Sequence, residues 1–425
     1  MNALALAVLA ACAVADGSVL TGAPVWASDP SGTSGFVMLR APDFTLRSAA
    51  QSATLFFAAL GSGATQGTLQ AKLLGSAAVH VNGVLVTLGP GHNVPTDTQV
   101  VRGVDVLPFL RGGGAANTVG IVGRFDRTSP APAQPRVQAV LQVTDAGGAY
   151  NVTATGASWS AWVADGYFQP SGDAGIAWYH MSQEDLNRSA YPQGWAQPGF
   201  QSPVGAWSPA VEQPAWLAPL AFEAAPPPAT LVRTACSVTN LSPTRQVLDY
   251  GQEFMGGVNL SFAGAAPGTR VTVTLAEELQ ADGTVLSPAR TRNRWCSNWT
   301  LSGDAAGGRD SGNVQHEFVQ FRYAQVDGAV AALAARSAAA GAWVLQYPAG
   351  GTGRNPWEAA CSRSTPAAEA YGSGAPPGAP LGAWASSSAP LDAVFNLSAY
   401  TILATSLDVN VDGQTRERDV GGWGR

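Results

Sequence analysis

The sequence is poor in charge, and the charge that it has is mostly acidic. Charged residues make up 12% of its 425 residues, and the formal net charge is −6 at pH 7. A protein that binds nucleic acid needs a basic face for the phosphates, so the composition excludes a nucleic-acid partner. At roughly 150 residues per domain, the length allows about two to four domains.

Long apolar runs are absent beyond the N-terminus, so we expect no membrane span. Residues 3–15 are apolar but too few to cross a bilayer, and they end in Ala13-Val14-Ala15 before Asp16. This small-residue pattern is typical of a signal-peptide cleavage site and predicts a leader over residues 1–15. Six of the fourteen asparagines stand in acceptor sequences for N-glycosylation: Asn151, Asn187, Asn240, Asn259, Asn298 and Asn396. We therefore expect a secreted glycoprotein.

Cysteine and histidine are scarce, with four residues of each. The sequence has no C-x-x-C pair, and its histidines are far apart. Zinc sites need several such ligands close together, so we expect no metal, and we expect no cofactor. If Cys12 leaves with the leader, Cys236, Cys296 and Cys361 remain. An odd number permits at most one internal disulfide and leaves one free thiol.

Glycine and proline are abundant, with 49 and 29 residues, and they disfavour long helices over most of the chain. Short alternating runs between turn residues predict antiparallel strands from about residue 36 to residue 143. Asn82-Gly83 between apolar residues predicts a tight hairpin over residues 79–86. We expect a first sandwich domain over residues 16–228, ending in a proline-rich run, with ordered loops over residues 159–216.

Strict alternation returns in residues 271–275 and 318–326 and predicts a second sandwich over residues 229–329. Residues 330–388 are rich in Ala, Gly, Ser and Pro, and we interpret them as a low-complexity linker. One helical stripe follows, from Leu391 to Leu403, with Ser386, Ser388 and Pro390 as start signals. This is the only long helix that the sequence predicts.

The densest group of charges lies directly after this helix, in residues 412–418, with the sequence DGQTRER. Carboxylates and guanidinium groups this close together suit an acid site that binds sugar. Arginines beside Glu417 favour its ionised form, so an acid role also needs burial or a second carboxylate nearby. The composition equally suits a solvated charge cluster.

Residues 412–418 resemble the active-site signature of the α-L-rhamnosidases of glycoside hydrolase family 78. Residues 247–257 (VLDYGQEFMGG), together with residues 276–279 and 321–323, are similar to the concanavalin-like sandwich of that family. Val81, Asn82, Gly83 and Trp195 resemble its N-terminal accessory domain. These matches follow the family's order.

The resemblance implies a mainly β fold with two or more antiparallel β-sandwich domains, jelly-roll or concanavalin-like. After them, residues 389–425 begin an (α/α)6 catalytic barrel. It implies an inverting enzyme that releases terminal α-L-rhamnose from rhamnose-containing carbohydrates. Glu417 takes the place of the general acid, and Asp412 and Arg416 take places in substrate binding. The family's general base lies further along, so the resemblance implies a truncated chain.

Other candidate residues have structural explanations. Asp249, Glu277 and Glu278 match family positions, yet in a sandwich such residues more often cap turns or pair with arginines such as Arg270 and Arg322. Five tryptophans suit either a sugar platform or core packing: Trp159, Trp162, Trp178, Trp195 and Trp207. The alternative function is a secreted, non-catalytic β-sandwich protein that binds carbohydrate. The sequence leaves the oligomeric state open.

Overall fold

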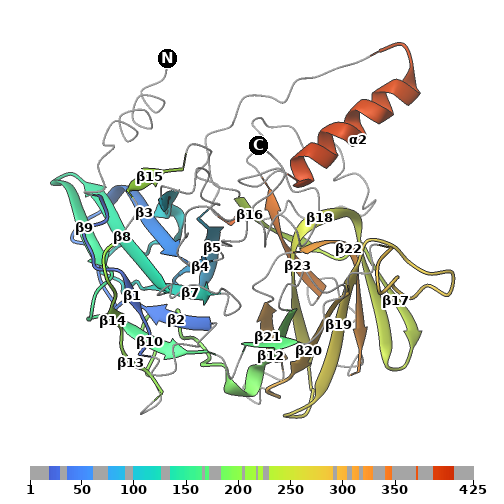
Figure 1. Ribbon diagram of the computed structural model, residues 1–425, viewed down its shortest axis with the longest axis horizontal. Helices are drawn as coiled ribbons and strands as arrows, with labels where there is room; N and C mark the ends of the chain where they lie inside the picture. Colours follow the sequence, from blue (N-terminus) through green and yellow to red (C-terminus); the bar gives the residue numbers. More distant parts are fainter. Residues whose placement is uncertain are drawn as a thin grey trace, which may run out of the picture. The chain divides into compact units, whose positions relative to one another are not determined.

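The chain divides into two compact units in a computed structural model (Figure 1). The first unit holds residues 1–164 and 192–227, and the second holds residues 165–191 and 228–425. The described residues are 19–28, 36–60, 75–90, 99–125, 135–164, 168–171, 183–202, 206–216, 219–223, 229–290, 294–303, 309–314, 319–328, 340–346, 370–371 and 386–405. The expected leader lies outside them.

The described part of the first unit forms a seven-stranded sheet (β14-β1-β8-β3-β6-β15, with β9 beside β8) and a six-stranded sheet (β13-β10-β2-β7-β4-β5). All pairs are antiparallel except β15 with β6. The elements are β1 (Val25–Trp26), β2 (Phe36–Arg40), β3 (Ala50–Leu60), β4 (Gly75–Val81), β5 (Val84–Gly89), β6 (Gln99–Asp105), a 3₁₀ turn (Leu107–Phe109), β7 (Val119–Phe125), β8 (Arg136–Asp145), β9 (Gly148–Ala154), β10 (Ser160–Val163), β13 (Ser208–Pro209), β14 (Val211–Glu212) and β15 (Leu220–Phe222).

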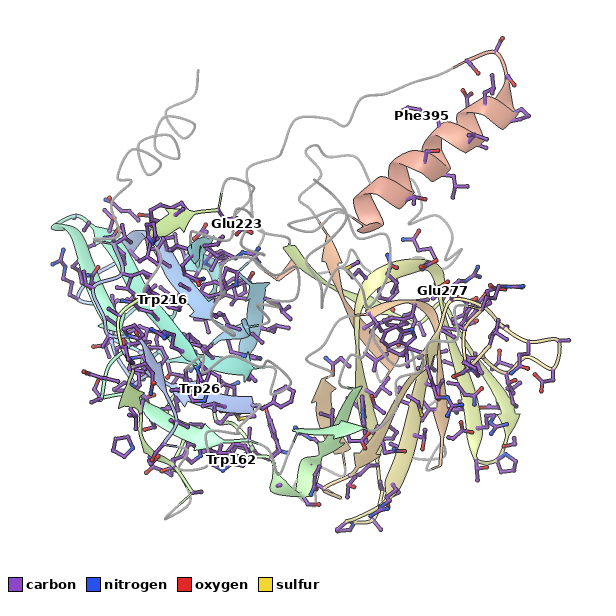
Figure 2. The ribbon with its side chains drawn as sticks, viewed as in Figure 1. Trp26, Trp162, Trp216, Glu223, Glu277 and Phe395 are labelled. Atoms are coloured by element: carbon purple, nitrogen blue, oxygen red, sulfur yellow. The ribbon has the colours of Figure 1, made fainter. Side chains whose placement is uncertain are left out.

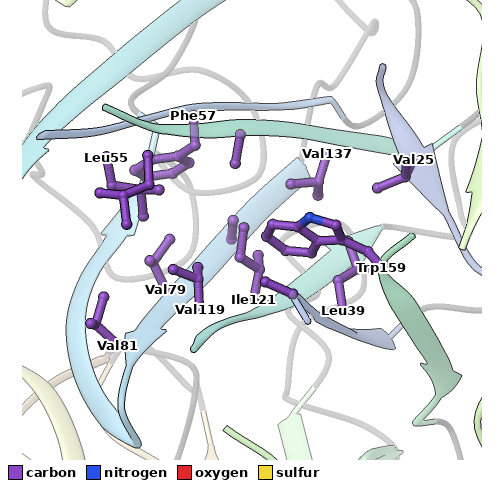
Figure 3. Packing of buried hydrophobic residues seen from close by; sticks show 14 of the residues in the cluster. Val25, Leu39, Leu55, Phe57, Val79, Val81, Val119, Ile121, Val137 and Trp159 are labelled. Carbon is purple, nitrogen blue, oxygen red and sulfur yellow. The ribbon is translucent and has the colours of Figure 1, made fainter. Parts of the chain in front are cut away.

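One hydrophobic cluster joins these two sheets into a sandwich (Figure 3). Leu39 and Ile121 of the six-stranded sheet share it with Phe57 and Val137 of the seven-stranded sheet, and all four are fully or almost fully buried. Alternate residues of a strand point to one face, so the alternation in the sequence supplies this core. Asn82 and Gly83 have φ angles of 52° and 85°, and they join β4 to β5 as predicted.

The second unit contains one sheet of eleven described strands, in the order β11-β12-β20-β19-β22-β18-β23-β16-β24, with β17 and β21 beside β18. All pairs are antiparallel except β12 with β20. The elements are β11 (Phe168–Ser171), β12 (Gln183–Asn187), a 3₁₀ turn (Arg188–Ala190), β16 (Ala229–Thr234), β17 (Ser237–Ser242), β18 (Arg245–Ala263), β19 (Arg270–Ala276), β20 (Trp295–Thr300), β21 (Arg309–Val314), β22 (Val319–Asp327), β23 (Ala340–Gln346), β24 (Ala370–Tyr371) and α2 (Ala389–Thr405).

The predicted mainly β fold with antiparallel sheets is confirmed, and several segments differ from their predictions. We expected residues 160–163 and 208–209 in ordered loops, but they form β10 and β13, which pair with each other. We expected residues 340–346 and 370–371 in a low-complexity linker. Residues 340–346 instead form β23, which pairs with β16 on one side and β18 on the other, and residues 370–371 form β24, which pairs with β16. We expected residues 168–171 and 183–187 in the first domain, but as β11 and β12 they extend the sheet of the second unit. Strands β23, β24 and β12 pair with strands distant in sequence, whereas β11 pairs with β12, the next strand along the chain.

The predicted helix is confirmed as α2. The backbone N–H of Asp392 donates to the carbonyl of Ser388, and the Asp392 carboxylate accepts from the backbone N–H of Ser386 at 2.8 Å. Leu391, Val394 and Leu397 are exposed by 53%, 60% and 57%. Among the described helices, none has the length and apolar content needed to cross a membrane.

The cysteines agree with the prediction of one disulfide and one free thiol. Cys236 is disulfide-bonded, and the thiol of Cys296 on β20 forms no disulfide. Burial raises the pKa of the Cys296 thiol, which keeps it protonated at neutral pH. The partner of Cys236 lies outside the described residues.

Candidate functional site

The three predicted site residues, Asp412, Arg416 and Glu417, lie outside the described part of the chain. The structure therefore does not test their roles. In the part that it describes, no group of three His, Cys, Asp or Glu side chains could hold a metal ion. The described residues of the second unit that match the family's motifs gather instead around an irregularity in β18.

Strand β18 contains a bulge where it pairs with β22. Asp249 pairs with Tyr323, but the next paired residues are Phe254 and Phe321. The four residues 250–253 of β18 therefore face a single residue, Arg322, on β22. Gly251 has a φ angle of 83°, which side chains other than glycine rarely adopt. Its backbone N–H donates to Asp249 Oδ1 at 2.7 Å.

An ion pair and three aromatic rings hold the bulge in place. Arg322 donates from Nε and Nη2 to the two carboxylate oxygens of Asp249 at 2.9 and 3.0 Å. Tyr250, Phe254 and Phe321 are buried, with ring centroids 4.7–5.7 Å apart. The prediction that Asp249 caps a turn and pairs with Arg322 is confirmed, so Asp249 stabilises the fold.

Glu253 lies in the bulge, close enough to Glu277 to feel its charge. Glu277 follows the end of β19 (Figure 2). Burial of its carboxyl group and repulsion from Glu277 raise the pKa of Glu253 to about 7. Burial and repulsion from Glu278 raise the pKa of Glu277. A carboxyl group with a pKa near 7, such as that of Glu253, can exchange protons near neutral pH. Glu253 as a whole residue is exposed, so solvent reaches it, although protein atoms surround much of its carboxyl group.

Glu278 has the opposite environment, because Arg290 binds it through two hydrogen bonds of 2.7 and 2.8 Å. These bonds lower the pKa of Glu278. As predicted, this carboxylate pairs with an arginine, although the arginine is Arg290 and not one of the two we named. Sequence reasoning did not single out Glu253. The signal was the Gly-Gln-Glu interruption in the alternation of β18.

A variant with Glu253→Gln should lose one component of the pH dependence of stability. Between the ordinary carboxyl pKa of 4.5 and the folded value of about 7, the folded state binds more protons than the unfolded state. The contribution of Glu253 to the parent's free energy of unfolding therefore falls as pH rises through this window and is level above it. The variant should match the parent near pH 4 and exceed it at pH 8, in urea unfolding.

Glu278→Gln is the matched control, since its carboxyl pKa is lowered. Its contribution to stability is present above the unfolded pKa and is lost as pH falls, so the control should lose stability at pH 8. Parallel profiles for the parent and Glu253→Gln would show that Glu253 has an ordinary pKa.

In the first unit, the tryptophans proposed as a sugar platform are mostly packed. Trp159 and Trp195 are exposed by 1% and 2%. Trp207 stacks on Trp162 and on Trp195, with ring centroids 6.2 Å apart in both pairs. Trp178 lies outside the described residues. The packing interpretation is therefore correct for Trp159 and Trp195.

Arg40 and Asp43 fix residues 195–200 beside these rings. Arg40 Nε donates to the carbonyl oxygen of Trp195 at 2.9 Å, and Asp43 Oδ2 accepts from the backbone N–H of Gly199 at 2.6 Å. The Arg40 guanidinium also lies over the ring of Phe200, 5.8 Å from its centroid. This segment therefore has a fixed place in its unit.

Gly120→Val should destabilise the first unit. A Cβ atom at Gly120 would lie 2.6 Å from Trp195 Cζ3 and 2.9 Å from Ala196 Cβ, so the tryptophan must move. Such overpacking costs about 1–3 kcal/mol, which urea unfolding monitored by tryptophan fluorescence measures. Gly112→Ala is the control, because a Cβ there meets nothing within 4 Å. Equal midpoints for both variants would contradict this packing.

Comparisons with known proteins support the resemblance that we drew from residues 247–257. Residues 239–344, which contain the β18 bulge, match the concanavalin-like domain of bacterial α-L-rhamnosidases. This is an α-L-rhamnosidase-like chain. The resemblance to glycoside hydrolase family 78 is confirmed at this level. An α-L-rhamnosidase of Streptomyces avermitilis is 27% identical over 285 residues, which are 61% of the α-L-rhamnosidase-like chain and 25% of that relative.

Solved structures show the same fold. The S. avermitilis α-L-rhamnosidase complexed with L-rhamnose has 21% identity and a TM-score of 0.59, covering 92% of this chain and 33% of that one. The enzyme from Dictyoglumus thermophilum has 17% identity and a TM-score of 0.54, covering 78% and 36%. The α-L-rhamnosidase-like chain thus spans about a quarter of its curated relative and about a third of these solved chains.

Proposed function

We propose that the chain belongs to a secreted glycoside hydrolase that releases terminal α-L-rhamnose from glycosides or polysaccharides. The match of residues 239–344 to the concanavalin-like domain of α-L-rhamnosidases carries this proposal. The family-like run DGQTRER at residues 412–418 supports it. The proposal gives no catalytic or substrate-binding role to the Trp162–Trp207–Trp195 stack or to the Asp249–Arg322 pair.

In the proposed mechanism, Glu417 is the general acid that protonates the leaving glycosidic oxygen. Asp412 and Arg416 bind the hydroxyl groups of rhamnose. Inversion requires a second carboxylate, about 6.5–9.5 Å away, to activate a water on the opposite face of the sugar. A neighbouring carboxylate also raises the pKa of an acid, which offsets the effect of the flanking arginines on Glu417.

The test measures the release of rhamnose and the binding of the protein to the polysaccharide in the same experiment. The purified protein is incubated with a rhamnose-containing polysaccharide and with an aryl α-L-rhamnoside, and free rhamnose is quantified. We expect rhamnose as the β-anomer first, because inversion changes the configuration at the anomeric carbon; NMR of fresh product detects it. Binding of the protein to the polysaccharide without any release of rhamnose would favour the non-catalytic carbohydrate-binding alternative.

A further inference from the structure

Strands β9 and β17 are edge strands of their units. Among the described strands, β9 pairs only with β8, and β17 pairs only with β18. Figure 1 shows each at the margin of its own unit. The outer N–H and C=O groups of an edge strand can pair with another chain, and proteins block such edges. Both strands carry an acceptor sequence for N-glycosylation.

On β17, Asn240 is exposed and lies opposite Gln246 of β18. Gln246 Nε2 donates to Asn240 Oδ1 at 2.7 Å. This bond uses the amide oxygen of Asn240 and leaves its amide nitrogen, Nδ2, for substitution. Ser242, which completes the acceptor sequence, is exposed as well.

On β9, Asn151 is also exposed. Its Nδ2 donates to the hydroxyl of Thr21 at 3.0 Å. A primary amide has two N–H bonds, so this contact uses one and leaves one for substitution. Thr153, which completes the sequence, lies beyond a register shift between β8 and β9 and pairs with Leu141, whereas Asn151 pairs with Gln142.

The acceptor asparagines of interior strands have different surroundings. Asn259 is half-buried and lies in β18 between Val314 of β21 and Gly341 of β23. Asn298 is on β20, which has β19 on one side and β12 on the other. Its Oδ1 accepts from Thr272 Oγ1 at 3.0 Å, and its backbone N–H donates to Asp185.

We propose that Asn151 and Asn240 carry N-linked glycans that cover the open edges of β9 and β17, and that Asn259 carries none. The donor is an oligosaccharide on a polyprenyl diphosphate lipid. Its bond from the anomeric carbon to the phosphate oxygen breaks, and a bond from that carbon to Nδ2 forms. The lipid diphosphate leaves, and Nδ2 loses one proton. The step involves no oxidation or reduction.

The test uses the 425-residue chain, secreted from a eukaryotic host behind a heterologous signal sequence. The result then depends neither on the chain's own leader nor on the proposed hydrolase activity. Enzymatic removal of N-glycans in ¹⁸O-water converts glycosylated Asn to labelled Asp, which peptide mass spectrometry locates. We expect label at residues 151 and 240 and none at residue 259. Thr153→Ala and Ser242→Ala should each remove the mass of one glycan.

Ser261→Ala is the matched control, because it destroys the acceptor sequence of Asn259, and we expect no change of mass. The double variant Thr153→Ala/Ser242→Ala should self-associate more than this control in light scattering at equal concentration. A secreted chain without label at residue 151 or residue 240, or with label at residue 259, would overturn the assignment. Unchanged self-association of the double variant would overturn the covering role.

Discussion

Replacing Arg102 by methionine should destabilise the first unit by about 3–5 kcal/mol, because it leaves a buried carboxylate without its counter-charge. The side chains of Arg102 and Glu223 are exposed by only 3% and 10%. Arg102 Nε donates to Glu223 Oε2 at 2.6 Å, Nη2 donates to Oε1, and Nη1 donates to the carbonyl of Leu88. The pair thus joins β6, β5 and the segment that contains β15. Urea unfolding measures the loss.

The same pair permits a rescue experiment. In Arg102→Met/Glu223→Leu both charges are absent, and an apolar pair of similar volume is close to neutral for stability. The double variant should therefore recover most of the loss. Arg290→Met is the control for an exposed pair, since Arg290 is exposed by 76%, and it should cost far less stability than Arg102→Met. Similar losses for Arg102→Met and Arg290→Met would show that burial of the first pair has no effect.

Replacing Glu417 by glutamine should lower the turnover of an alkyl α-L-rhamnoside by about 10²–10⁴-fold, if Glu417 is the proposed acid. Glutamine keeps the size and hydrogen-bonding reach of the side chain but has no acidic proton. An aryl rhamnoside has a leaving group that needs less protonation, so its turnover should fall less. Initial rates of rhamnose release on both substrates give the comparison.

Asp419→Asn provides a matched control for this prediction. It removes a carboxylate two residues from Glu417 that has no assigned role, so its effect on both substrates should be small. Equal, small losses on the alkyl and aryl substrates for Glu417→Gln would remove Glu417 from the acid role and leave the hydrolase activity itself open.

Much of the fold could be predicted because its signals are local. Asn82-Gly83 is enough to specify a tight hairpin, and the alternation of residues 271–275 is enough to specify β19. The helical stripe with its serine start signals specifies α2. Strand β23 lacked such a signal, because residues 340–346 lie within an Ala- and Gly-rich segment. Their strand structure comes from pairing with β16 and β18, and sequence alone does not show which strands meet.

The candidate site likewise has features that could be predicted from the sequence and features that could not. The pairing of Asp249 with an arginine could be predicted, since a sandwich carboxylate seldom stays unpaired. The raised pKa of Glu253 could not, because it depends on the register between β18 and β22. Arg322 and Asp249 are 73 positions apart in the sequence. The bulge between them sets where Glu253 lies, and that register is a property of the assembled sheet.

Residues 165–191 divide the first unit into two pieces of sequence, and this limits how the protein can be cut or recombined. A break after residue 164 removes β13, β14 and β15 from the first unit, and a fragment that starts at residue 228 lacks β11 and β12. No single breakpoint yields two complete units. Gene fusions and proteolytic fragments cut at only one of these boundaries should therefore misfold, because each would lack strands of one unit.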